Sequence, residues 1–129
     1  MYKILIADDD PRIREILRVY FKKADFEVIE AEDGQQALTK VEKEKPNIVL
    51  LDIMMPVMDG LTATKTIRSL ERQDAKTIPI IAMTANAFRE DAEKCMEAGM
   101  NAHLAKPLDD EKIKQTISEE LRKQNACHE

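Results

Sequence analysis

The chain has 129 residues, the usual size of a single domain, and its apolar (43%) and charged (35%) fractions are those of a globular protein. Its formal net charge of −5 argues against direct binding to nucleic acid, which requires a positive face. No apolar run approaches the roughly 20 residues of a membrane span, the amino terminus lacks the layout of a signal peptide, and two cysteines are too few for a disulfide framework or a zinc site. We therefore expect a cytoplasmic protein with free thiols and no membrane segment.

Five short apolar runs, each followed by a longer amphipathic stretch, organise the chain. The runs occupy residues 4–7, 26–31, 48–51, 78–83 and 102–105. Between them the apolar spacing becomes helical, and the stripes contain Ile13, Ile16, Leu17, Tyr20 and Phe21, then Phe88, Ala92, Cys95 and Met96, and last Ile113, Ile117 and Leu121. Strands that alternate with helices predict an α/β fold, a (βα)5 chain around a parallel sheet.

Residues typical of helix ends agree with this interpretation. Asp10 before Pro11 and Asp33 farther on are typical N-caps, and Gly99 is typical of a helix stop. We expect one domain over residues 1–122, followed by a polar tail over 123–129 that frays.

The composition of each run predicts its place in the sheet. The runs at 4–7, 48–51 and 78–83 are continuously apolar, as strands covered by helices on both faces must be. The run at 26–31 is interrupted by glutamates, and the run at 102–105 is short and contains a histidine, so these two are the predicted edges. Right-handed crossovers then give a doubly wound, flavodoxin-like order 2-1-3-4-5, which binds ligands at the carboxyl ends of strands 1 and 3.

Polar residues stand at the predicted carboxyl ends of four strands. Asp8 and Asp9 follow the first, Asp52 the third, Thr84 the fourth and Lys106 the fifth. The three carboxylates carry about −3 when ionised, and their repulsion favours a hard divalent cation such as Mg²⁺. With the cation bound, a phosphoryl group becomes tolerable: Lys106 neutralises one of its oxygens and Thr84 donates a hydrogen bond. Asp52 is the best-placed nucleophile toward phosphorus.

Four segments in order resemble the receiver domain of two-component response regulators, and the resemblance extends from Lys3 to about Arg122. The segments are Lys3–Pro11 (KILIADDDP), Leu50–Gly60 (LLDIMMPVMDG), Ile80–Ala85 (IIAMTA) and Ala105–Pro107 (AKP). The resemblance implies a phosphorylation-dependent switch that accepts a phosphoryl group from a histidine kinase or a histidine phosphotransfer protein. In this reading the chain is no kinase itself but promotes its own phosphotransfer and dephosphorylation.

The resemblance also implies roles for individual residues. The phosphoacceptor corresponds to Asp52, and the Mg²⁺ ligands correspond to Asp8, Asp9, Asp52 and the backbone carbonyl of Met54. The phosphate-pairing lysine corresponds to Lys106.

The switch residues correspond to Thr84 and to His103, where the family usually has tyrosine or phenylalanine. Phosphorylation is expected to change the surface formed by the helix after the fourth strand, the fifth strand and the last helix, which binds an output partner. The stretches 83–88 and 95–101 resemble receivers of hybrid histidine kinases, which implies either an excised module or a stand-alone relay protein. Kinase activity is expected only if the chain is part of a larger hybrid kinase.

Other interpretations of single residues remain open. His103 is also read as an exposed edge residue, and Cys95 as a core residue on its helical stripe. Met54, Met55 and Met58 form either a docking surface for the donor or the packing of the loop.

Two other functions compete with the signalling switch. Asp8 and Asp10 have the spacing of the aspartates in haloacid-dehalogenase-type phosphatases, although Pro11 and Arg12 do not fit that motif. A flavin-binding module would share the fold class, but three aspartates after the first strand would repel the flavin phosphate.

Overall fold

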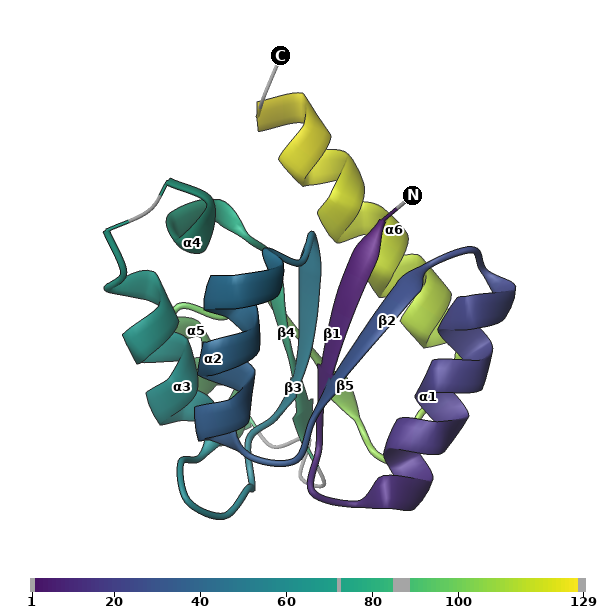
Figure 1. Ribbon diagram of the computed structural model, residues 1–129, viewed down its shortest axis with the longest axis horizontal. Helices are drawn as coiled ribbons and strands as arrows, with labels where there is room; N and C mark the ends of the chain where they lie inside the picture. The colour runs from purple at the N-terminus through teal and green to yellow at the C-terminus, as the bar shows by residue number, and fades with distance from the viewer. Residues whose placement is uncertain (1, 72, 85–88, 128–129) are drawn as a thin grey trace.

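The computed structural model describes residues 2–71, 73–84 and 89–127 (Figure 1). The strands are Lys3–Ala7 (β1), Glu27–Ala31 (β2), Ile48–Asp52 (β3), Ile80–Thr84 (β4) and Ala102–Ala105 (β5). The helices of the described residues are Pro11–Lys23 (α1), Gly34–Glu44 (α2), Gly60–Arg68 (α3), Gln73–Thr77 (α4), Arg89–Ala98 (α5) and Asp110–Cys127 (α6).

The five strands form one parallel sheet in the order β2-β1-β3-β4-β5, as predicted. The two strands with polar interruptions lie at its edges. The fourth strand begins two residues later than the apolar run, because Pro79 has no N–H to donate to a neighbouring strand. The short helix α4 was not predicted, since five residues are too few to show a helical period.

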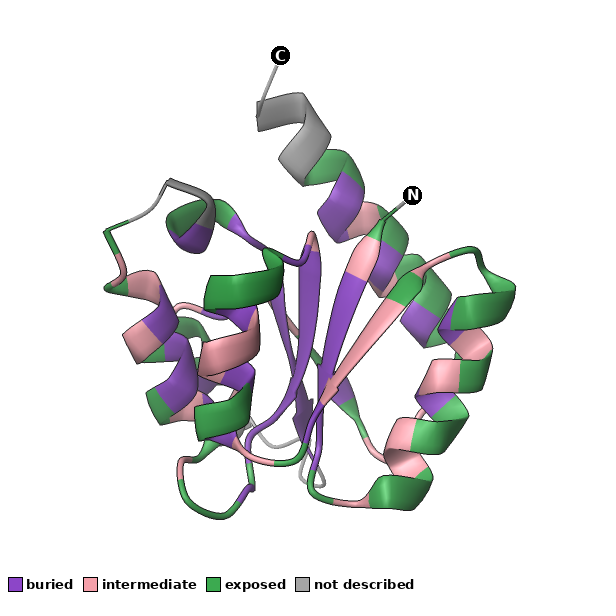
Figure 2. Ribbon diagram, viewed as in Figure 1, coloured by how far each residue is buried: buried purple, intermediate pink, exposed green. Residues whose placement is uncertain are grey.

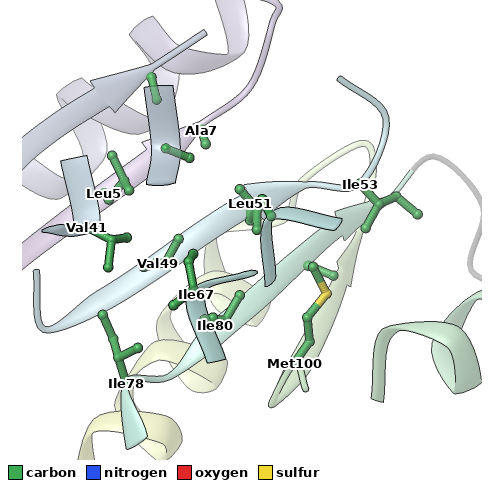
Figure 3. Close-up of a cluster of buried hydrophobic side chains, with 14 of the residues drawn as sticks. Leu5, Ala7, Val41, Val49, Leu51, Ile53, Ile67, Ile78, Ile80 and Met100 are labelled. Atoms are coloured by element: carbon green, nitrogen blue, oxygen red, sulfur yellow. The ribbon is translucent and has the colours of Figure 1, made fainter. Parts of the chain in front are cut away.

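Helices cover both faces of the sheet (Figures 1 and 2). On one face α1 and α6 pack through Leu17, Phe21 and Ile117 against β1, β3 and β4. On the other face α2, α3 and α5 pack against the alternate residues of the same strands, such as Leu5, Val49 and Ile80, as Figure 3 shows. The central strands are therefore buried from both sides, which explains their continuously apolar sequences. In the described residues, no helix has the length and apolarity that crossing a membrane requires.

Two apolar residues of the predicted stripes do not lie in the core. Ile16 is 65% exposed and Met96 is 58% exposed, although both lie in helices, as predicted. Each lies one position beside a buried residue of its helix, and the sheet covers a narrower strip of the helix than the stripe assumed. Phe88 and Ala85 lie outside the described residues.

The predicted helix ends agree with the structure. The carboxylate of Asp10 accepts a hydrogen bond from Arg12 N at 2.9 Å, and that of Asp33 accepts one from Gln36 N at 2.8 Å. Gly99 follows α5 with a φ of 107°, a conformation that favours glycine. Helix α6 continues to Cys127, within the stretch predicted as a tail.

Candidate functional site

The predicted site residues meet at the carboxyl ends of the strands. Asp8 follows β1, Asp52 and Thr84 are the last residues of β3 and β4, and Lys106 follows β5. One carboxylate oxygen each from Asp8, Asp9 and Asp52 lie within 4.8 Å of one another. Asp52 thus joins the adjacent pair Asp8 and Asp9 in one acidic cluster, because parallel strands end at the same edge of the sheet.

Lys106 joins the cluster from the edge strand. Its Nζ lies 2.9 Å from Asp8 Oδ2 and 3.3 Å from Asp52 Oδ2. Its backbone N–H donates to the carbonyl oxygen of Thr84 at 2.8 Å, which fixes the chain directly after β5 against the end of β4. The ammonium group therefore lies between two carboxylates from different strands.

Every polar atom of Asp8 takes part in a hydrogen bond. Its N–H donates to the Ala31 carbonyl at 3.1 Å, and its own carbonyl accepts from Arg14 Nη1 at 2.6 Å. Its Oδ1 accepts from Asp10 N at 2.9 Å, and its Oδ2 accepts from Lys106. The side chain is completely buried, whereas the neighbouring Asp9 is exposed. Asp8 is thus rigidly placed, and Asp9 faces solvent at the mouth of the cluster.

Asp52 is a buried carboxylate with a perturbed proton affinity. It is 4% exposed, and its Oδ1 accepts from Met54 N at 3.1 Å. Burial raises the pKa of Asp52 from its ordinary value of 3.8 to about 6. The hydrogen bond from Met54 opposes this rise in pKa, the charge of Asp8 adds to it, and the charge of Lys106 opposes it. Without a bound metal ion, Asp52 is therefore harder to ionise than an ordinary aspartate.

The pKa of Lys106 is raised. Burial alone would lower the pKa of this ammonium group, but the hydrogen bond to Asp8 and the charges of Asp52 and Asp8 outweigh the burial. Lys106 therefore carries its positive charge at neutral pH.

Two residues that support the cluster were not singled out from the sequence. Arg14, in the first turn of α1, donates a hydrogen bond to the carbonyl oxygen of Asp8. The spacing of apolar residues does not reveal such a contact. Gly60 starts α3 directly against the end of β3: a Cβ there would lie 2.4 Å from the carbonyl oxygen of Asp52. Gly60 ends one of the segments that carry the family resemblance, but the sequence predicted no role for it.

The methionines of the loop after β3 divide between two roles. Met54 is 73% exposed beside the cluster, whereas Met55 is buried and Met58 packs against the core. Met54 is therefore free to meet a partner, and the other two pack the loop. His103 is exposed on the edge strand β5, and Cys95 is buried in the core, as expected. The role of the Met54 carbonyl as a metal ligand stays a prediction.

The donor set of the cluster fits a hard divalent cation. Three carboxylates from two neighbouring strands offer oxygen ligands, and the cluster contains neither sulfur nor imidazole. A cation there would also relieve the repulsion between Asp8 and Asp52 that raises the pKa of Asp52. The residues present therefore suit Mg²⁺.

Comparison with known sequences gives one consistent family. The model of the response regulator receiver domain matches residues 4–118. The chain is 39% identical over 115 residues to the sensor histidine kinase RcsC of Escherichia coli K12, covering 89% of this chain and 12% of that protein. It is 32% identical to the alkaline phosphatase synthesis transcriptional regulatory protein PhoP of Bacillus subtilis, covering 94% of this chain and 49% of that protein. The chain spans between 7% and 15% of the length of RcsC and other histidine kinases to which it is similar.

Solved structures give the same result. The receiver domain of sensor histidine kinase PA1611 from Pseudomonas aeruginosa, which has a magnesium ion coordinated in its active-site cleft, has a TM-score of 0.85 at 32% identity and 93% and 97% coverage of the two chains. A response regulator receiver domain protein from Methanospirillum hungatei has a TM-score of 0.89 at 28% identity and 98% coverage of both chains. Given the match over almost its whole length, this chain belongs to the receiver-domain family of two-component response regulators.

Proposed function

We propose that this chain accepts a phosphoryl group onto Asp52 from a phosphohistidine donor, with Mg²⁺ bound by Asp8, Asp9, Asp52 and the backbone carbonyl of Met54. The observation that carries the proposal is the position of Asp52. Its buried carboxylate belongs to the acidic cluster at the switch point of the sheet and shares the ammonium group of Lys106 with Asp8.

The transfer forms one bond and breaks one. A carboxylate oxygen of Asp52 attacks phosphorus, the phosphorus–nitrogen bond of the donor breaks, and its electron pair returns to the imidazole ring. Bound Mg²⁺ supplies positive charge to the carboxylates and to the phosphoryl oxygens. Lys106, already 3.3 Å from Asp52 Oδ2, stays protonated and neutralises a further oxygen of the acyl phosphate. Hydrolysis of that acyl phosphate by water resets the switch.

The phosphorylated state is signalled through Thr84 and the edge of the sheet. The acyl phosphate adds about one negative charge near the buried end of β4, where the Thr84 hydroxyl donates to it. Movement of Thr84 changes the surface of α5, β5 and α6, which includes His103 and binds the output partner. The donor is a cytoplasmic histidine kinase domain or a histidine phosphotransfer protein, and this chain acts beside it in the cytoplasm.

The phosphatase alternative is disfavoured by a hydrogen bond. In a haloacid-dehalogenase-type mechanism, Asp8 would be the nucleophile and Asp10 would be the acid that faces it. Asp10 instead caps α1, where its carboxylate accepts from Arg12 N. This hydrogen bond also lowers the pKa of Asp10, which favours the ionised form that has no proton to donate.

Intact mass measured after incubation with acetyl phosphate tests the proposal. The wild type is expected to gain one phosphoryl group only when Mg²⁺ is present, and Asp52→Asn is expected to gain none. Asp25→Asn is the matched control, because it removes the same charge from an exposed position at the far end of α1. An adduct that forms equally in Asp52→Asn would refute the assignment of the phosphoacceptor.

A further inference from the structure

A hollow lies at the opposite end of the sheet from Asp52 and the acidic cluster. It is lined by the carboxyl-terminal turns of α1, the middle of α6 and the residues around the start of β1 and β2, and its volume is about 530 Å³. We call it the α1–α6 hollow. Pockets that hold small ligands have volumes of about 300–1,000 Å³, so its size suits such a ligand. Tyr2 and Asp8 flank β1 at its two ends, which separates this hollow from the acidic cluster by about 16 Å of extended strand.

The walls of the α1–α6 hollow contain most of the aromatic residues of the protein. The chain has two tyrosines, three phenylalanines and no tryptophan, and four of these rings line the hollow. Phe21 packs edge-on against Tyr20 and Phe26, with ring centroids 5.0 and 5.2 Å apart, and Tyr2 lies 5.9 Å from Phe26. Ile117 and Leu121 complete the apolar wall. Such walls favour an apolar, preferably aromatic, ligand.

The rim of the hollow is positively charged in a protein whose net charge is −5. Lys114 and Arg122 line it from one face of α6, and no carboxylate side chain does so. Neither cation forms an ion pair with any residue that the structure describes. An apolar hollow with two available cations at its rim is complementary to a ligand that has an apolar body and one negative charge.

We propose that the α1–α6 hollow binds a small organic anion with an aromatic body, of the class of the arylalkanoic acids. The ring packs in the hollow against the side chains of Tyr2, Tyr20 and Phe26, and the carboxylate reaches the rim at Lys114 and Arg122. The site is separate from the acidic cluster, so ligand binding does not depend on phosphoryl chemistry at Asp52.

Titration with 4-phenylbutyrate, followed by ¹H–¹⁵N correlation spectra, tests the proposal. Saturable shifts are expected at the amides of the hollow and not around Asp52. The neutral amide of the same acid is the matched ligand, and it is expected to bind about three- to tenfold more weakly because it lacks the charge. Absence of shifts up to millimolar concentrations, equal affinity for acid and amide, or shifts elsewhere on the protein would each overturn the proposal.

Variants of exposed residues test the two halves of the site without disturbing the core. The double variant Lys114→Gln and Arg122→Gln is expected to lower the affinity for 4-phenylbutyrate to that for the neutral amide. Lys112→Gln is the control for each of the two substitutions, since it removes one positive charge from α6 beside a different hollow. Ser118→Phe fills the hollow from an exposed position and is expected to abolish binding of both ligands. Unchanged affinity in these variants, with folded spectra, would refute the site.

Discussion

Replacing Asp52 with asparagine is expected to stabilise the metal-free protein at neutral and alkaline pH. Because the pKa of Asp52 is raised from 3.8 to about 6 in the folded state, the folded protein binds this proton more tightly than the unfolded chain does. The stability contributed by the protonated carboxyl is complete below pH 4 and is lost as the pH rises through about 6. Above that pH, the buried ionised carboxylate destabilises the fold.

The size of the effect follows from the shift in pKa. A rise of about two units corresponds to about 3 kcal/mol at most. An asparagine that keeps the hydrogen bond from Met54 must turn its amide toward Lys106, which offsets part of the gain. We therefore expect Asp52→Asn to be more stable than the wild type by about 1–3 kcal/mol at pH 8, with a difference that approaches zero near pH 4.

Urea unfolding in the presence of a chelator, repeated between pH 4 and pH 8, measures this difference. Asp25→Asn serves as the control for the loss of one charge, and its difference from the wild type should not change over the same range. A difference between Asp52→Asn and wild type that stays constant with pH, or a variant less stable than the wild type at pH 8, would show that burial does not raise the pKa of Asp52 as argued.

Four further substitutions test other parts of the site. Thr84→Ala should leave the extent of phosphorylation unchanged but reduce the shifts that phosphorylation causes in the NMR signals of α5, β5 and α6. Shifts as large as those of the wild type would contradict the role of Thr84 in the switch. Gly60→Ala should lower the free energy of unfolding by about 1–3 kcal/mol and slow phosphorylation, because its Cβ meets the Asp52 carbonyl; a variant as stable as wild type in urea would contradict the close approach. Met55→Ala should cost about 2 kcal/mol or more, whereas Met54→Ala should change stability by less than about 0.5 kcal/mol; equal effects on thermal unfolding would contradict the division of the loop.

The strand order of the sheet was predictable because a strand that is buried on both faces has a continuously apolar sequence. Continuously apolar runs identified β1, β3 and β4 as central, and polar interruptions identified the edges. The residues that follow the strands then had to meet at one edge, so the geometry of Asp8, Asp52 and Lys106 followed from topology.

Other features depend on contacts that no period encodes. Whether Ile16 is buried depends on how wide a strip of α1 the sheet covers, and it proved exposed. Gly60 matters because the backbone of Asp52 lies too close to leave room for a side chain. Arg14 matters because it binds the backbone carbonyl of Asp8, and a backbone group leaves no trace in the choice of side chain at position 8. The α1–α6 hollow was invisible for the same reason, because its aromatic residues come from three separate segments.

Locating the phosphorylated residue tests the central claim most directly. After incubation with a small phosphodonor and Mg²⁺, borohydride reduction converts an aspartyl phosphate to homoserine, and peptide sequencing by mass spectrometry shows its position. We predict homoserine at position 52 alone, and none when Mg²⁺ is chelated. Homoserine at position 8 or 9, or a phosphoryl adduct on a residue outside the acidic cluster, would contradict the assignment of Asp52 as the phosphoacceptor.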